Sequence, residues 1–208
     1  MQTKKKEKLF LPQSISGFTM IELLVAIAIS SIVMLIVIQF FMSTNQLNTI
    51  QEEVASTQQS IRAAMEIMSR DIRMAGLDSS NSAADEGFAD NGAENNDTDS
   101  DSVAIRYNYD GTGGCEVDRS YYFDSVNEQF MIRDGGSYQS LTEPGTIDSV
   151  TFSYTLGDGS NDPDPSASGN LGNIRVVSVR ICGKITGAYS DVHTTTYCFS
   201  NSIKPRNM

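Results

Sequence analysis

The strongest constraint on the fold is an apolar run of 20 residues from Leu23 to Met42, interrupted only by Ser30, Ser31 and Gln39. As an α-helix, a run of this length spans the hydrocarbon core of a bilayer. Four lysines between residues 4 and 8 precede it, and positive charge on this side predicts that the N-terminus stays in the cytoplasm. The chain is therefore predicted to carry a membrane-crossing helix close to its N-terminus.

One acid, Glu22, stands at the start of this run. A carboxylate inside a membrane costs about 2.5–3.5 kcal/mol on insertion scales. A simple membrane anchor has no use for such a charge, so Glu22 is predicted to have a partner.

The segment from Gly17 to Glu22, Gly-Phe-Thr-Met-Ile-Glu, followed by the apolar run, resembles the class III signal of type IV pilins and type II secretion pseudopilins. In that family, prepilin peptidase cleaves after the glycine and methylates the new N-terminal residue. The resemblance implies cleavage between Gly17 and Phe18, N-methylation of Phe18, and Glu22 as the fifth mature residue. The alternative is an ordinary single-pass inner-membrane protein, in which the leader, glycine, aromatic residue and acid coincide by chance.

The charge of the chain excludes one class of partner. The formal net charge is -11, and the leader through Gly17 contributes four lysines and one glutamate, so the mature chain carries -14. Nucleic-acid binding needs clustered cations and is not expected. An acidic surface suits a soluble head in the periplasm or outside the cell.

Helical periodicity continues beyond the membrane run. No Pro or Gly occurs between Phe18 and Ala75, and Gly76 then supplies a stop signal, so a helix of 58 residues is predicted. Steps of three, four or seven place one apolar stripe on its second half. The stripe predicts packing on a sheet, with a coiled coil as the alternative; it consists of Leu47, Ile50, Val54, Ile61, Met65, Met68 and Ile72.

The rest of the chain is typical of antiparallel strands. Alternating or β-branched segments occur at 102–107, 147–156, 174–182 and 192–199, and 119–123 with 129–133 indicates a hairpin. Polar loops are expected at 78–101 and 157–172. The predicted fold is α+β and pilin-like: a long N-terminal helix packed on an antiparallel β-sheet of about five to seven strands. The predicted parts are a leader (1–17), a transmembrane or filament-core helix (18–44), an amphipathic helix (45–76) and a β-rich head (77–208).

A second resemblance lies at the predicted helix end. The segment from Met68 to Leu77 is similar to the Arg-Asp-x-Arg-x-Ala-Gly segment that closes the helix in the PilW family of minor pilins, and J-type pseudopilins of type II secretion have a similar one. An acid such as Asp71 is unfavourable near a helix C-terminus. Asp71 is therefore predicted to have a local partner, and Arg70 is the nearest candidate.

Three cysteines, Cys115, Cys182 and Cys198, lie beyond the membrane run, on the side predicted to be oxidising. One disulfide and one spare thiol are expected. If the last two predicted strands form a hairpin around residue 190, Cys182 faces Cys198. The rival pairing joins Cys115 to either of the other two.

Two acidic clusters raise the question of a metal. Asp97, Asp99 and Asp101 alternate, as in many calcium loops, and the group Asp158, Asn161, Asp162 and Asp164 is also rich in oxygen. Neither has EF-hand spacing, and a solvated acidic loop without metal is favoured. His193 is the only histidine and cannot build a typical zinc site. No cofactor and no catalytic residue are predicted, so the chain is not expected to be an enzyme.

The resemblances together imply a minor pilin of the type IV pilus, a structural subunit that primes assembly. Its implied partners are prepilin peptidase, other minor and major pilins and, before assembly, the inner membrane. Glu22 would pair with the Phe18 ammonium of a neighbouring subunit. The head would lie in the periplasm first and on the pilus at the cell surface later. The alternatives are a J-type minor pseudopilin of type II secretion and a calcium-dependent adhesin on a pilin stem.

Overall fold

One helix, α1 (Met20–Met74), accounts for the first part of the structure, a computed structural model that describes residues 17–77, 87–90, 97–109, 117–184 and 196–208. It has 55 residues, begins directly after Thr19, and ends just before Gly76, whose φ of 75° no longer continues a right-handed helix. The predicted long helix is confirmed, because no residue within it interrupts the backbone hydrogen bonds.

The chain divides into two compact units, the first ending at Asn48 and the second beginning at Thr49. In the first unit the apolar side chains of α1 are exposed. In the second unit, α1 buries one face, which begins at Thr57 and runs to Ile72. The predicted stripe is therefore buried only in its later part, and Leu47 remains 57% exposed.

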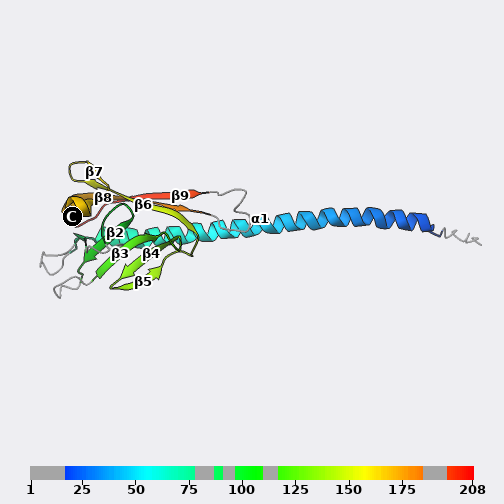
Figure 1. Ribbon diagram of the computed structural model, residues 1–208, viewed down its shortest axis with the longest axis horizontal. Coiled ribbons are helices and arrows are strands. Elements are labelled where there is room, and N and C mark those ends of the chain that lie inside the picture. Colours follow the sequence, from blue (N-terminus) through cyan, green and yellow to red (C-terminus); the bar gives the residue numbers. More distant parts are fainter. Residues whose placement is uncertain (1–16, 78–86, 91–96, 110–116, 185–195) are drawn as a thin grey trace, which may run out of the picture. The chain divides into compact units, whose positions relative to one another are not determined.

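The first sheet is a five-stranded antiparallel meander (Figure 1). Its strands pair in chain order: β1 (Gly87–Phe88), β2 (Ser102–Tyr107), β3 (Val117–Asp124), β4 (Gln129–Asp134) and β5 (Ser137–Ser140). The predicted hairpin is confirmed as β3 and β4, whose turn is closed by backbone N–H groups donated to the Asp124 carboxylate. Strands β1 and β5 were not predicted, because both are short and neither alternates.

The second sheet has four antiparallel strands in the order β7-β6-β8-β9. Its elements are β6 (Ile147–Leu156), β7 (Asn161–Asp162), β8 (Ile174–Gly183) and β9 (Tyr197–Ile203), with the short helices α2 (Pro165–Ser168) and η1 (Leu171–Asn173) between β7 and β8. Cys182 lies opposite Cys198 in the β8–β9 register, and a disulfide joins them, as the hairpin predicted. Cys115 lies outside the described residues.

The strands form two sheets, where the sequence predicted one. The boundary follows β5, all of whose residues are exposed, so that β5 ends the first sheet. The chain then enters β6, which pairs with β7 and β8. Backbone N–H groups of β6 donate to segments that flank strands of the first sheet: Ile147 to the Glu128 carbonyl and Phe152 to the Ser100 carbonyl. One core collects apolar side chains from α1 and both sheets, including Met68, Ile72, Tyr121, Phe130, Phe152 and Ile181.

Candidate functional site

The start of α1 is closed by a reciprocal pair of side chains. The Thr19 backbone N–H and hydroxyl donate to Oε2 of Glu22 over 2.9 and 2.8 Å, and the Glu22 N–H donates to the Thr19 hydroxyl over 3.4 Å. This is a capping box, which satisfies backbone N–H groups that have no partner in the first turn. The partner of Glu22 within the chain is thus Thr19. The Thr-x-x-Glu spacing is the sequence signature of a capping box, so this contact could have been predicted from the sequence.

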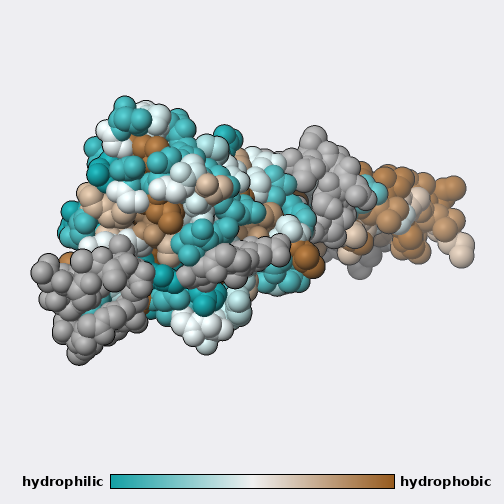
Figure 2. All heavy atoms as spheres, turned by 60° about the vertical axis from the view of Figure 1, so that its left-hand side comes forward, coloured by the Kyte–Doolittle hydropathy of each residue, from teal (hydrophilic) through white to brown (hydrophobic). Residues whose placement is uncertain are grey.

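The residues around the implied cleavage position are open to solvent. Gly17 has no heavy atom within 4 Å of the place where a Cβ would stand, and Phe18 is 90% exposed. The following apolar side chains of α1 are between 43% and 74% exposed from Leu23 to Met42. Figure 2 shows hydrophobic residues gathered along this part of the helix. Among the described residues, α1 is the one helix long and apolar enough to cross a membrane.

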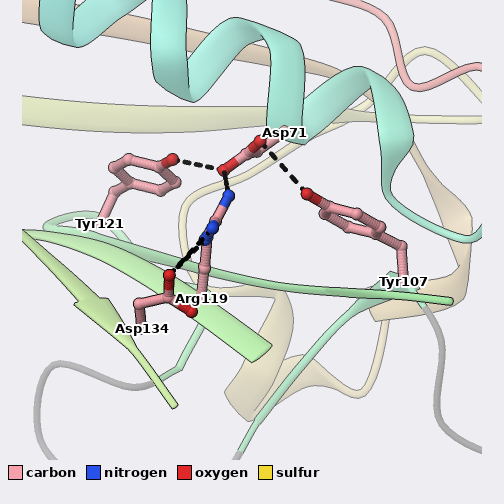
Figure 3. A network of polar contacts seen from close by, with 5 residues as sticks. All are labelled: Asp71, Tyr107, Arg119, Tyr121 and Asp134. Carbon is pink, nitrogen blue, oxygen red and sulfur yellow. Dashed lines mark hydrogen bonds and ion pairs between the residues drawn. The ribbon is translucent and has the colours of Figure 1, made fainter. Parts of the chain in front are cut away.

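A buried carboxylate, Asp71, lies near the other end of α1 (Figure 3). It is 1% exposed and sits where α1 meets β2 and β3. Tyr121 donates its hydroxyl to Oδ2 over 2.6 Å, Arg119 donates from Nη1 to the same oxygen over 3.1 Å, and Tyr107 approaches Oδ1 at 3.4 Å. Three donors from two strands therefore converge on one carboxylate.

The network extends to the surface through Arg119. Its guanidinium also donates from Nε and Nη2 to Oδ2 of Asp134 over 3.0 and 2.9 Å. Although burial opposes the charge, the hydrogen bonds to Asp134 and Asp71 raise the pKa of Arg119. Burial first and the nearby Asp71 carboxylate second raise the pKa of Tyr121, and the same causes raise the pKa of Tyr107.

The arrangement holds charges in place; nothing in it points to a reaction. Every Asp71 oxygen is engaged by a donor, which satisfies a carboxylate that would be costly to bury alone. The prediction that Asp71 has a local partner, with Arg70 as the candidate, was wrong. Asp71 forms its ion pair with Arg119, 48 positions away in the sequence. Tyr107 lies on β2, and Arg119 and Tyr121 lie two residues apart on β3. The sequence could not show that these three side chains meet Asp71.

Several residues of the segment from Met68 to Leu77, which resembles the end of the PilW-family helix, have a structural role. Ala75 is fully buried. Gly76 has a positive φ, and a Cβ there would stand 2.9 Å from Cγ of Met208 and 3.1 Å from the carbonyl oxygen of Asn207. The Arg206 N–H donates to the Arg73 carbonyl over 3.2 Å. The segment thus joins the helix end to the last residues of the chain.

The acidic residues Asp97, Asp99 and Asp101 lie in a folded turn. Oδ1 of Asp99 accepts the N–H groups of Asp101 and Ser102 over 2.9 and 2.8 Å, and the Ser102 hydroxyl donates to Asp97 over 2.8 Å. Hydrogen bonding to Asp99, together with burial, raises the pKa of Asp101 to about 6.

No cluster of three metal-ligating side chains is found within the described ranges. In the second acidic group, Asp158 and Asp162 accept hydrogen bonds from nearby Ser and Asn side chains, and Asp164 caps α2. Calcium binding was the less favoured alternative for these residues, and it stays untested. His193 lies outside the described residues.

Comparison with known proteins gives two matches. Residues 51–203 match the family model described as prepilin peptidase-dependent protein B. Residues 13–38 match the prokaryotic N-terminal methylation motif, which covers the Gly17–Phe18 junction, Glu22 and most of the apolar run. A search of curated proteins found no match.

Proposed function

This chain belongs to the family of prepilin peptidase-dependent protein B, and from that membership we propose that it is a minor pilin of the type IV pilus. In this proposal the protein is a structural subunit that primes filament assembly and catalyses no reaction. The observation that carries the proposal is the first half of α1, which is apolar, exposed and headed by Glu22, on a chain whose second unit is folded into a β-rich head.

The first step of the proposed function is processing by prepilin peptidase. The Gly17–Phe18 bond lies in exposed chain before the first helical residue, Met20, so a peptidase can reach it without unwinding α1. Cleavage leaves an ammonium on Phe18, which is then methylated. The capping box survives this step, because its atoms belong to Thr19 and Glu22.

The second step is assembly. Exposed apolar surface of this size is unfavourable in water and is covered by lipid before assembly and by neighbouring helices afterwards. In the filament core the Glu22 carboxylate would meet the Phe18 ammonium of an adjacent subunit. Such a pair offsets the cost of two charges in an apolar environment and sets the axial register.

The proposed location follows from the same parts. The lysines of the leader hold the N-terminus on the cytoplasmic side, so the head lies in the periplasm, and after assembly it lies on the filament outside the cell. A J-type pseudopilin of type II secretion would use the same processing and packing. The two alternatives differ only in the appendage that the subunit joins.

The test combines mass spectrometry with two cellular assays. In cells with active prepilin peptidase, the protein should begin with N-methylated Phe18; in cells lacking the peptidase, it should keep the leader. A leader retained in both strains would refute the proposal. Deletion of the gene should reduce surface pili and leave secretion of type II substrates unchanged; the opposite pattern would favour the pseudopilin.

A further inference from the structure

A groove of about 800 Å³ runs between the second half of α1 and strand β9. Its α1 wall carries Arg62, Arg70 and Arg73, all exposed and spaced so that they share one face of the helix. Arg206, from the chain segment that follows β9, adds a fourth guanidinium. One acid, Glu66, also lines the groove.

This concentration of positive charge is unusual for the chain. The mature sequence has 11 Lys and Arg and a net charge of -14, yet four of these cations line one groove. Elsewhere Arg106, Arg119, Arg133 and Lys184 are in ion pairs with carboxylates. Among the described residues, the side chains of Arg70, Arg73 and Arg206 form no ion pair. They are therefore available to a partner's carboxylates.

The opposite wall of the groove is the edge of a sheet. Strand β9 is the last strand in the order β7-β6-β8-β9, and it pairs with β8 along its whole length. Within the described residues, no backbone hydrogen bond is made by the other edge of β9. Alternate N–H and C=O groups of an edge strand point outward and can pair with a further strand. The Phe199 ring is held under Arg62, whose Cζ lies 5.3 Å from the ring centroid.

We propose that this groove binds an acidic, extended polypeptide segment of another protein, which adds a strand to the edge of β9. Backbone hydrogen bonds to β9 would supply affinity, and carboxylates on one face of the added strand would meet the arginines of α1. The β9 strand of seven residues offers about 23 Å of edge at 3.3 Å per residue, which suits a segment of similar length.

A peptide fits better than a long polyanion. The mature chain repels nucleic acid at a distance, and residues 78–101 alone hold eight acids and no Lys or Arg. A short acidic segment in the groove instead interacts electrostatically mainly with the nearby guanidinium groups, because salt screens charges that are more than about 8 Å away. A peptide also uses the strand edge, for which a nucleic acid has no complementary groups.

The test uses the full-length protein in detergent and a fluorescent peptide of alternating Asp and Val, followed by anisotropy. The peptide should bind, and Arg70→Glu and Arg73→Glu should each weaken binding about fivefold through loss of one charged contact. The matched control is Arg175→Glu, an exposed arginine of β8 outside the groove, which should change binding less than twofold.

A second probe separates strand addition from simple charge attraction. The same peptide with alternate backbone nitrogens methylated keeps its carboxylates but cannot pair with β9, and it should bind at least tenfold more weakly. Equal binding of both peptides, equal loss in Arg73→Glu and Arg175→Glu, or no binding of either peptide would overturn the proposal. Tighter binding of a single-stranded oligonucleotide of the same charge would also overturn it, in favour of a nucleic-acid site.

Discussion

The hydroxyl of Tyr121 donates to the carboxylate of Asp71 over 2.6 Å, between residues that are 50 positions apart. Asp71 lies near the end of α1, and Tyr121 lies on β3 in the centre of the first sheet. This contact, with those of Arg119 and Tyr107, joins the helix to the sheet through one buried charge. In the proposed minor pilin it would fix the head to the helix that enters the filament.

Asp71→Asn tests the weight of this contact. The substitution keeps the shape of the side chain but removes the negative charge to which Arg119 and two tyrosines donate hydrogen bonds. The free energy of unfolding should therefore fall by about 3 kcal/mol. Chemical denaturation of the full-length protein in detergent measures it. The control is Asp134→Asn, whose side chain is 43% exposed and should cost less than about 1 kcal/mol. Equal losses would contradict the central role of Asp71.

Stability should fall in alkaline solution, in part because of Tyr121. Burial and the Asp71 carboxylate raise the pKa of Tyr121 in the folded chain. In the unfolded chain its hydroxyl ionises near pH 10, so above about pH 10 the unfolded state binds fewer protons and the free energy of unfolding decreases as pH rises.

Tyr121→Phe should make this decrease between about pH 10 and 11 less steep. The variant lacks the hydroxyl proton that the folded state retains and the unfolded state loses in this range, so the two states differ less in the number of bound protons. Denaturant titrations at each pH, after treatment of the folded protein with an alkylating agent, measure the slope. A slope unaltered in Tyr121→Phe would show that its hydroxyl ionises equally in both states.

The bond between Cys182 and Cys198 should contribute about 3 kcal/mol to stability on the chain-entropy estimate, since the two cysteines are 16 positions apart. The double variant Cys182→Ser and Cys198→Ser should lose this amount in denaturation experiments, whereas Cys115→Ser should lose little. Peptide mapping without reduction checks the pairing directly. A linked peptide that contains Cys115 would show that another pairing prevails in the oxidised protein.

Gly76 should tolerate alanine poorly. A residue other than glycine at this positive φ costs about 1–2 kcal/mol, and the added Cβ also meets Met208 and the Asn207 carbonyl oxygen. Gly169→Ala is a matched control, because Gly169 has a φ of 73° and no atom within 4 Å of a Cβ. Gly76→Ala should therefore lose at least about 1 kcal/mol more than Gly169→Ala. Equal losses would mean that the chain end does not pack on Gly76.

Glu22 has one observed role, in the capping box, and one proposed role, in pairing with a neighbouring ammonium, and the two can be separated. Glutamine at this position can keep the capping box but carries no charge, whereas Thr19→Val removes the hydroxyl and keeps the charge. If Glu22 pairs with a neighbouring ammonium, Glu22→Gln and Glu22→Ala should both reduce piliation while leaving cleavage intact, and Thr19→Val should reduce it less. Normal piliation with Glu22→Gln would leave capping as the only role of this residue. Counts of surface pili, with intact mass as the record of cleavage, decide the outcome.

Local features of the sequence were sufficient for several parts of this protein. The absence of Pro and Gly from 18 to 75, followed by Gly76, predicted α1, because helix formation depends on residues within one turn of each other. Alternation predicted β2, β6 and the β3–β4 hairpin. The Gly-Phe junction with Glu22 predicted a prepilin signal, and the methylation-motif match supports it.

Other features depend on contacts between distant residues, and only the tertiary structure decided them. Asp71 pairs with Arg119 and not with its neighbour Arg70, because the packing of α1 on the first sheet turns that carboxylate toward β3. The strands divide into two sheets because β6 pairs with β8, a choice that side-chain alternation does not specify. The arginine-lined groove likewise exists only because Arg206 and β9 return to the side of α1. Each of these depends on register and packing, which a local pattern does not encode.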